Sequence, residues 1–470
     1  MNRPPEDVRR VPSRMLGTAG RIPALPETGP LCPLISGSQC PSVVQHGTTL
    51  GFRAARSIIA RMKALHFAFT FTSMATAAFA APPEPKFSAQ DLDVKIEIGY
   101  GLAVADVDGD GKPDVLLADK KQFVWYRNPG KRGVAWDKFV LAENLTEKDN
   151  VCIAARDIDG DGKCEIAVGA EWNPGDTVKS GAVFYLIPPA DRTQKWEAVK
   201  FPSVEPTTHR MKWVRTGEKD WGLLVSPLHG RGNKNGEGEP VKTLLSHFPK
   251  DSAGIRAEWK SEVVEASSHM THNFERLAFP ESPVPEALLV AGKEGVAITF
   301  LENGKWKPKR AIAHAAYSPV LPGIGEFRVG WSTRDGKREP FGAAIEPMHG
   351  NTLAVYQQDP ENPESTTPPR TVLTDKLADG HALACGDVLG LGSDQIVVGW
   401  RAMGKAGVKV GVALWAPLDD KGAQWRETLI DDNTMACEDL ALADLDSDGK
   451  LDIVASGRGT KNVKIYWNER

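Results

Sequence analysis

The sequence predicts an all-β protein, a single seven-bladed β-propeller, from two observations. Short apolar runs typical of strands alternate with turns rich in Gly and Pro, and the chain of 470 residues contains 45 Gly and 34 Pro. A strand–turn–strand frame also recurs seven times between Ala81 and Arg470. Its spacing of about 56 residues suits the four strands and loops of one propeller blade.

The N-terminal part of the chain is expected to lie outside this domain. Residues 62–80, "MKALHFAFTFTSMATAAFA", begin with a basic residue, continue with an apolar run and end in Ala78-Phe79-Ala80, which is the pattern of a secretory signal peptide. A transmembrane anchor is the alternative, but the run is short for a bilayer. We therefore expect a non-native or unstructured leader at 1–61, a signal peptide at 62–80, a linker at 81–90 and the propeller at 91–470. The protein would be secreted, either periplasmic or extracellular.

The first unit contains an acidic loop, "DVDGDGKPD" (Asp106–Asp114), between the apolar runs "GLAVA" and "VLLA". The pattern recurs as "DIDGDGKCE" (Asp157–Glu165) in the second unit and as "DLDSDGKLD" (Asp444–Asp452) in the seventh. A degenerate copy that starts at Asp387 lacks most of the acids. An EF-hand needs a Glu at loop position 12 and a helix on each side. Position 12 is Leu117 within an apolar run, so each loop is expected to join two strands.

The chemistry of these loops favours a hard cation. Carboxylates packed this closely repel one another unless a cation takes their oxygens, and Ca²⁺ prefers six to eight oxygen ligands. Gly111, Gly162 and Gly449 permit the sharp turn that directs successive oxygens inward. We expect three structural calcium sites; an acidic hairpin turn without metal is the alternative.

The third, fourth and fifth units keep the frame without the acids, as in "MKWVRTGEKDWGLLVSP". Six units close with a Trp or Pro followed by a short alternating strand, such as "WDKFVLAE" or "WRETLI". The seventh unit reaches the C-terminus without one. The run "LDVKIEI" (92–98) before the first unit is expected to supply the missing strand and close the ring, which removes an exposed sheet edge.

The three acidic loops, each between apolar strands, resemble the FG-GAP/VCBS repeats of integrin-α-like propellers. The resemblance covers the architecture and these loops, and it does not specify an activity. It implies three sets of calcium ligands, the first completed by the carbonyl of Lys112: Asp106, Asp108, Asp110 and Asp114; Asp157, Asp159, Asp161 and Glu165; Asp444, Asp446, Asp448 and Asp452.

Composition narrows the classes of partner. The chain is 41% hydrophobic and 25% charged, with a formal net charge of −4 and no basic run, so neither nucleic acid nor stable membrane insertion is expected. Export would permit disulfides among Cys152, Cys164, Cys385 and Cys437, for which three pairings exist. Buried free thiols are the alternative.

The histidines lie mostly in units without acidic loops. Alignment of the units at the start of the first strand places these residues at one register: Tyr100, Val151, His209, His272, Gly325 with Glu326, His381 and Glu438. Alignment at the end of the second strand places these at another: Lys120, Glu171, His229, Lys293, His349, Arg401 and Arg458. Because first strands line the channel of a propeller, both sets are expected to converge around its axis.

This convergence predicts a transition-metal site. Imidazole is the commonest transition-metal ligand, and three His with one open position form a catalytic site. We expect His209, His229, His349 and His381 to bind Zn²⁺ or another divalent metal. His272, Tyr100 and Glu438 are candidates for proton transfer, and Lys293, Arg401 and Arg458 for oxyanion stabilisation. For any single His, a hydrogen-bonded structural role is the alternative.

The segments "THR", "PLHGRGN", "HMTHN", "EPMHGN" and "DGHAL" are similar to the propeller domain of aldos-2-ulose dehydratase, a sugar-processing lyase. The cupin domains of that enzyme have no counterpart in this sequence. The resemblance implies a metal-assisted β-elimination on a keto-sugar, with a carbohydrate or sugar-derived small molecule as partner.

Two other classes stay open. A non-catalytic extracellular module would bind glycan or protein through its loops, and a hydrolase would use the same metal to activate water. A transition metal on the axis, in addition to calcium, distinguishes an enzyme from a binding module.

Overall fold

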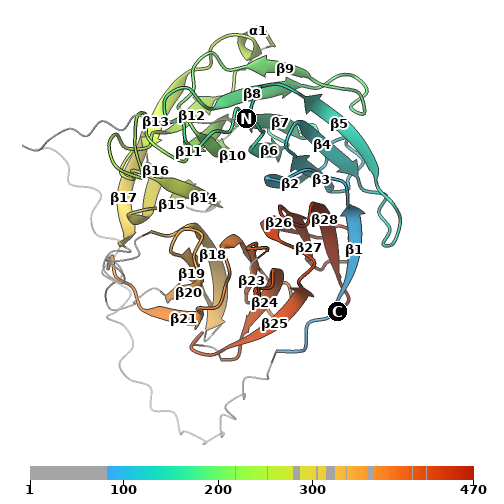
Figure 1. Ribbon diagram of the computed structural model, residues 1–470, viewed down its shortest axis with the longest axis vertical. Coiled ribbons are helices and arrows are strands. Elements are labelled where there is room, and N and C mark those ends of the chain that lie inside the picture. The colour runs from blue at the N-terminus through green and yellow to red at the C-terminus, as the bar shows by residue number, and fades with distance from the viewer. Residues whose placement is uncertain are drawn as a thin grey trace, which may run out of the picture. The chain divides into compact units, whose positions relative to one another are not determined.

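The computed structural model describes residues 82–470 apart from 218, 251, 279–285, 303–304, 314–322, 335, 358–361, 363–364, 405 and 420. Within this part, 28 strands form seven four-stranded antiparallel sheets arranged as the blades of a propeller (Figure 1). The predicted leader and signal peptide lie outside the described residues. None of the described helices is long and apolar enough to span a membrane.

Each blade contains four consecutive strands except the last, and the strands below are given from the axis outward. Blade 1 is β2 (Gly101–Ala105), β3 (Asp114–Ala118), β4 (Gln122–Arg127) and β5 (Asp137–Glu143); blade 2 is β6 (Cys152–Arg156), β7 (Glu165–Ala170), β8 (Ala182–Ile187) and β9 (Glu197–Lys200); blade 3 is β10 (Thr208–Arg215), β11 (Trp221–Pro227), β12 (Thr243–His247) and β13 (Ser261–Glu265). Blade 4 is β14 (Thr271–Ala278), β15 (Glu286–Gly292), β16 (Gly295–Glu302) and β17 (Lys305–Ala313); blade 5 is β18 (Glu326–Arg334), β19 (Lys337–Glu346), β20 (Thr352–Gln357) and β21 (Arg370–Thr374); blade 6 is β22 (Gly380–Gly386), β23 (Gln395–Trp400), β24 (Gly411–Pro417) and β25 (Trp425–Asp432). Blade 7 is β26 (Cys437–Ala443), β27 (Asp452–Gly457), β28 (Asn462–Asn468) and β1 (Phe87–Asp93), and one short helical turn, α1 (Ser252–Ile255), precedes β13.

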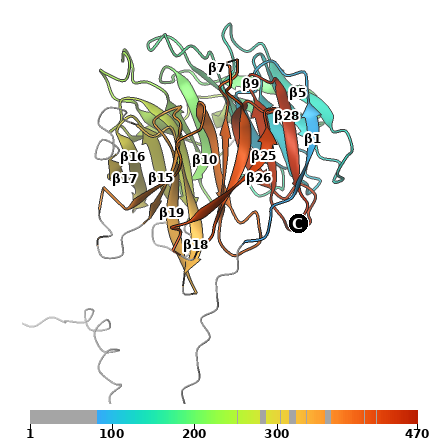
Figure 2. The same ribbon diagram turned by 60° about the horizontal axis from the view of Figure 1, so that its bottom comes forward.

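The ring is closed by β1, which pairs antiparallel with β28 and sets Phe87 opposite Asn468. Figures 1 and 2 both show β1 beside β28. The closing strand thus comes from the N-terminal side, as predicted, but its position was wrong: the predicted segment 92–98 shares only its first two residues with β1. Part of the segment expected to be a linker, 81–90, therefore belongs to blade 7.

The physical reason lies in the hydrogen bonds of both segments. The carboxylate of Asp119 accepts the backbone N–H groups of Glu97 and Ile98 at 2.8–3.0 Å, which holds that segment as a turn. In contrast, Gln90 in β1 accepts the indole N–H of Trp467 in β28 at 2.9 Å. An outermost strand buries little, so pairing with its neighbour matters more than its apolar content.

The core lies between neighbouring blades. The second strand of blade 1, β3, is buried along its whole length, which explains its continuous apolar run. Trp125 of blade 1 and Ile166 of blade 2 belong to one apolar cluster. The recurring Trp also joins blades: Trp196 is buried in this cluster, and its backbone N–H donates to Leu141 O of blade 1 at 2.8 Å.

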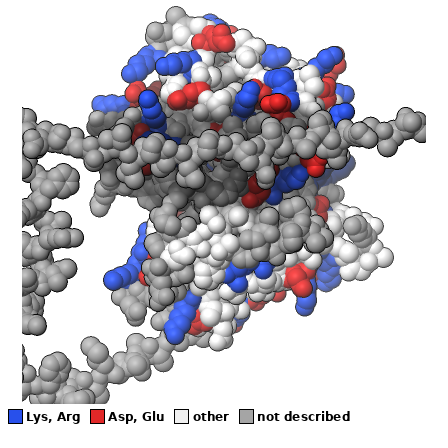
Figure 3. All heavy atoms as spheres, turned by 90° about the vertical axis from the view of Figure 1, so that its left-hand side faces the viewer, with Lys and Arg blue, Asp and Glu red and all other residues white. Residues whose placement is uncertain are grey.

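The four cysteines of the propeller are free thiols, which confirms the alternative without disulfides. Cys152, Cys164 and Cys437 are buried, and burial raises the pKa of the Cys152 thiol to about 12. On the face drawn in Figure 3, Lys and Arg side chains are interspersed with Asp and Glu.

Candidate functional site

The structure confirms that the first register lies at the start of the innermost strands. His209, His272, His381 and Glu438 are each the second residue of their strand, in β10, β14, β22 and β26 respectively. The second register follows the ends of the second strands, where His349 lies after β19 and Arg401 directly after β23. Because the inner strands surround the axis, these side chains gather at one end of the central channel.

Three imidazoles form a compact cluster that we call the axial His cluster: His272, His349 and His381. Each offers one nitrogen, and all three nitrogens lie within 4.8 Å of one another. The Nε2 atoms of His349 and His272 are 2.8 Å apart, and the ring centroids of His381 lie 4.9 Å from those of both partners. His272 and His381 are buried, whereas the side chain of His349 is 40% exposed. The cluster therefore meets solvent on the His349 side.

The other ring nitrogen of each member is held by a partner. Nδ1 of His272 lies 3.0 Å from both the Gly325 carbonyl and Glu326 Oε1, and Nδ1 of His381 lies 2.6 Å from the Glu438 carbonyl. These acceptors place the proton on Nδ1 and leave Nε2 with a lone pair. Such bonds orient metal-binding imidazoles in proteins.

His349 is placed differently. Its Nδ1 lies 2.9 Å from Arg401 Nη2 and 3.4 Å from Asp379 Oδ1. Arg401 can only donate, so Nδ1 of His349 is the acceptor and the proton of the neutral ring is on Nε2. This Nε2–H then donates to Nε2 of His272. As a metal ligand, His349 would carry the proton on Nδ1, facing Asp379. Its backbone has φ +57°, an uncommon conformation for a residue other than Gly, which sets the direction of the ring.

All members of the cluster are expected to be neutral at physiological pH. Burial lowers the pKa of His272 and His381, and the nearby charge of Arg401 lowers both further. The pKa of His349 is also lowered, first by burial and then by His272 and Arg401. Neutral imidazole is the form that binds metals.

A network of charged groups borders the cluster. The guanidinium of Arg401 donates to Glu438 and lies 3.1 Å from Asp379 Oδ2. Glu438 Oε1 lies 4.0 Å from His381 Nε2 and 3.8 Å from Arg458 Nη1. Arg458 in turn covers the ring of Tyr100, with its Cζ 5.3 Å from the ring centroid. Burial raises the pKa of Tyr100, which keeps its hydroxyl protonated.

The structure does not assemble every predicted site residue. His209 lies beside the cluster, with its ring centroid 4.9 Å from that of His272 and stacked on Trp172 at 5.0 Å, but it is not among the three converging nitrogens. His272, expected to transfer protons, takes the place expected for His209. The backbone N–H of His229 donates to Thr207 Oγ1 at 2.9 Å, and its imidazole is not among the three converging rings.

Lys293 also lies apart from the charged network. Its Nζ donates to the Gly236 carbonyl at 3.0 Å, so this side chain anchors the loop that follows His229.

Two residues of the site were not singled out in the sequence. Asn273 donates to both oxygens of Glu326 at 2.8–3.0 Å, and this carboxylate fixes the ring of His272. Asp379 contacts both Arg401 and His349. Their signal was adjacency, because Asn273 directly follows His272 and Asp379 stands two residues before His381.

Three of the four predicted calcium ligands converge in each acidic loop. The groups whose oxygens lie within 4.8 Å of one another are Asp106, Asp108 and Asp114; Asp157, Asp159 and Glu165; Asp444, Asp446 and Asp448. The remaining acids have other contacts: Asp110 pairs with Lys112 at 2.6 Å, Asp161 accepts the N–H of Lys163 at 2.8 Å, and Asp452 accepts that of Asn468 at 2.8 Å.

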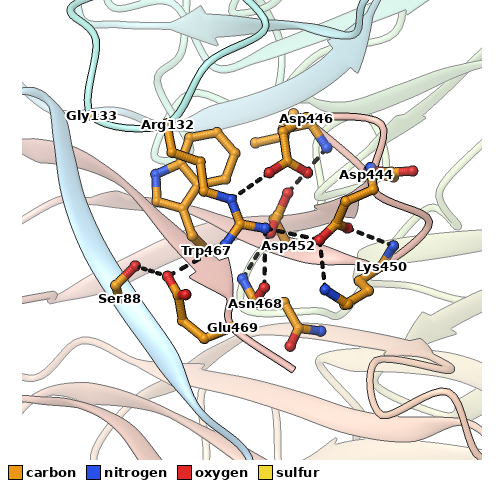
Figure 4. Close-up of polar contacts among 12 residues, drawn as sticks. Ser88, Arg132, Gly133, Asp444, Asp446, Lys450, Asp452, Trp467, Asn468 and Glu469 are labelled. Atoms are coloured by element: carbon orange, nitrogen blue, oxygen red, sulfur yellow. Dashed lines mark hydrogen bonds and ion pairs between the residues drawn. The ribbon is translucent and has the colours of Figure 1, made fainter.

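The loop of blade 7 contains one feature that fits a cation. Arg132, from the loop after β4, contacts Asp446 (Figure 4). It also lies 3.1 Å from Asp448 Oδ2. The other oxygen of Asp446, Oδ1, is buried without a hydrogen-bond partner. A buried acceptor of this kind is costly unless it is satisfied, and a calcium ion would satisfy it.

Blade 6 provides an internal comparison for these loops. Asp387 accepts the N–H groups of Leu391 and Gly392 at 2.7 Å, as Asp106 accepts those of Gly109 and Gly111 at 2.7 and 2.8 Å. The turn therefore forms in a loop that lacks most of the acids. The additional acids of the other three loops are therefore not needed for the turn itself.

Two regions of the chain match known protein families. Residues 106–168, which contain the first two acidic loops, match the FG-GAP-like repeat. Residues 180–359 match the β-propeller domain of aldos-2-ulose dehydratase, and this stretch includes His209, His229, His272 and His349. A search of curated proteins finds no match. The chain is a seven-bladed β-propeller that combines an FG-GAP-like repeat with a region similar to the propeller domain of aldos-2-ulose dehydratase.

Proposed function

We propose that this protein is an exported, calcium-stabilised propeller that catalyses a metal-assisted elimination of water from a keto-sugar. The observation that carries the proposal is the axial His cluster: three neutral imidazoles converge, and two of them have Nδ1 bonded to a carbonyl or carboxylate. Structural His side chains do not need to converge, whereas a metal site does.

The donor set fits a divalent transition metal. His272, His349 and His381 would hold the ion through Nε2, and the exposed side of His349 leaves room for a fourth ligand. When bound, such an ion polarises the carbonyl group of a substrate and so acidifies the neighbouring C–H bond.

The side chains around the cluster fit the remaining requirements of a β-elimination. Glu438 Oε1 faces the cluster and accepts the proton from the carbon next to the carbonyl. The electron pair of that C–H bond forms the new double bond while the C–O bond at the next carbon breaks. Arg401 and Arg458 stabilise the enolate charge, and the protonated hydroxyl of Tyr100 supplies the proton with which the hydroxyl leaves as water.

The similarity to the propeller domain of a dehydratase supports the same class of reaction. It covers 180–359, which includes His272 and His349 but not His381, Arg401 or Glu438. The roles proposed for these last three residues are supported only by their contacts in blades 6 and 7. The proposal therefore has two independent supports, one from similarity and one from contacts.

We further propose that the three acidic loops bind Ca²⁺ through the converging carboxylates, in addition to backbone carbonyls and water. Their role would be structural, because each loop joins the first two strands of a blade and lies away from the axial His cluster.

A direct test is an elimination assay with a panel of aldos-2-uloses and related keto-sugars. The conjugated product absorbs in the ultraviolet, and formation of the enone without added nucleophile distinguishes a lyase from a hydrolase. Glu438→Gln should lower kcat by about 10²–10⁴-fold, as expected for loss of a proton-transfer group. His247→Gln, on the outer strand β12, serves as the matched control and should keep activity.

The proposal fails if no keto-sugar is consumed by protein loaded with Zn²⁺, Mn²⁺ or Co²⁺. Binding of a glycan or protein without turnover would then favour the non-catalytic extracellular module. Release of a sugar by addition of water, without an enone, would favour the hydrolase.

A further inference from the structure

The central channel contains a second site beyond the axial His cluster. A cavity of about 360 Å³ is lined by residues from the innermost strands of all seven blades. None of the His in the cluster lines it. Its lining residues come later along the same strands, on the side toward the acidic loops. The volume lies at the lower end of the range for small-molecule pockets.

The lining of this channel cavity is rich in cations. Its charged side chains are five basic residues and two acidic ones: Arg156, Arg210, Lys212, Arg276 and Arg328, with Glu275 and Asp439. A soluble protein rarely buries charges unless they are paired. The contacts of these seven groups therefore show whether any buried charge lacks a partner.

The two acidic side chains are already engaged. Glu275 Oε2 lies 3.5 Å from Lys212 Nζ and 3.4 Å from Arg328 Nε. Asp439 accepts the backbone N–H groups of Leu102 and Leu440 at 2.9 and 3.0 Å. Burial raises the pKa of Asp439, and the charge of Arg210 partly opposes this rise.

Arg210 is the cation that remains unmatched. It is 9% exposed, and its guanidinium has one hydrogen bond, from Nη1 to the His209 carbonyl at 3.1 Å. Its Nε is buried without an acceptor, and no described carboxylate lies within ion-pair distance of it. A buried guanidinium with unused donors is unfavourable unless an acceptor joins it.

We propose that this cavity binds a small anion that carries a carboxylate or phosphate group, with Arg210 as its principal contact. A planar guanidinium matches both groups through paired N–H donors. Lys212, from the same strand as Arg210, adds a third donor. The cavity would admit a ligand about the size of a monosaccharide acid.

Two side chains, Glu326 and Asn273, lie between the anion site and the axial His cluster. Glu326 contacts His272 through Oε1 at 3.0 Å and Arg328 through Oε2 at 2.9 Å. Asn273, which lines the cavity, donates to both of these oxygens. The inference therefore does not depend on metal binding or on the proposed elimination.

The test measures thermal unfolding of calcium-loaded protein stripped of transition metals. Inorganic phosphate, D-glucuronate and neutral D-glucose are titrated at constant ionic strength. Phosphate or glucuronate should raise Tm saturably by mass action, and glucose should not. Arg210→Met should weaken the apparent affinity about 10–100-fold, as expected for loss of hydrogen bonds to a charged group. Arg256→Met, which removes an exposed arginine paired with Glu197, is the control and should respond as the parent does.

Arg210→Met is expected to fold, because it removes an unpaired buried cation rather than one half of an ion pair. His381→Ala should bind the anion as tightly as the parent, which separates this site from the proposed metal. The inference is overturned if neither anion raises Tm, if Arg210→Met responds as the parent does, or if His381→Ala alone loses the response. Crystals soaked in selenate give a check without any variant: selenium must be located in the channel cavity, and its absence there overturns the proposal.

Discussion

Removal of calcium should make the propeller less stable as the pH rises from about 4 to 7. Asp114, the last acid of the first loop, is buried, and burial is the main reason why its pKa is raised to about 7. Asp108 and Asp110 raise it further, whereas N–H bonds from Asn128 and Val107 lower it. The corresponding acids of the other loops behave alike: the pKa of Glu165 is about 7 and that of Asp452 about 6.

The sign follows from proton linkage. Between the ordinary aspartate pKa of 3.8 and the folded value of about 7, Asp114 keeps a proton in the folded state that the unfolded chain has released. The free energy of unfolding then falls by about 1.4 kcal/mol per pH unit for this group, or up to about 4 kcal/mol over the interval. Glu165 and Asp452 add smaller amounts because their pKa values rise less, from 4.5 to about 7 and from 3.8 to about 6. Bound Ca²⁺ favours the ionised carboxylates and removes this loss.

The assay is Tm as a function of pH for calcium-free and calcium-loaded protein. The two curves should separate as the pH rises and approach each other in acid. Asp108→Asn should reduce the separation, whereas Asp387→Asn, in the blade 6 loop that lacks most of the acids, should leave it unchanged. Curves that coincide at every pH would refute the reasoning and favour acidic turns without metal.

Three further predictions concern other parts of the chain. Arg132→Met should destabilise the protein by about 1–3 kcal/mol, because it removes a charged contact between blade 1 and the blade 7 loop. Denaturant titration should find a larger loss of stability without calcium than with it. An equal loss in both forms would contradict a shared role of Arg132 with the ion. In a chain that starts at Ala81, and so leaves out Cys32 and Cys40, a thiol reagent should leave Cys152, Cys164 and Cys437 unmodified in native protein. It should label all four remaining cysteines after unfolding without reductant, and fewer than four would reveal a disulfide. A chain that starts at Met62 should be exported with Ala81 as its mature N-terminus, and N-terminal sequencing that finds residues 1–61 on the secreted protein would contradict the signal peptide.

The propeller was predictable because each repeat contains strong local sequence signals. Acidic turns, buried second strands and the recurring Trp each mark one position of a blade, and every mark depends on neighbours in sequence. The closing strand has no such mark. In β1, "FSAQDLD", few residues are apolar, and its place depends on pairing with β28 at the far end of the chain. The more apolar run 92–98 has the stronger strand signal in the sequence, although Asp119 holds it as a turn in the structure.

The candidate site was predicted to the level of register but not of side-chain direction. Alignment of the blades correctly placed His272, His349, His381 and Arg401 at one end of the channel. It could not show that the imidazole of His229 stays outside the group of converging rings. Nor could it show that a left-handed backbone at His349 sets its ring beside His272. These outcomes depend on loop conformation, which has no periodic signature in sequence.

The most direct test of the account is the transition-metal content of the purified propeller, measured by mass spectrometry of the metal after equilibration with Zn²⁺ and removal of excess. We expect one Zn²⁺ per chain in addition to calcium. His349→Ala and His381→Ala should each lose it, whereas His229→Ala should retain it. A wild-type protein without transition metal, or the same content in all three variants, would contradict the metal centre on which the proposed function rests.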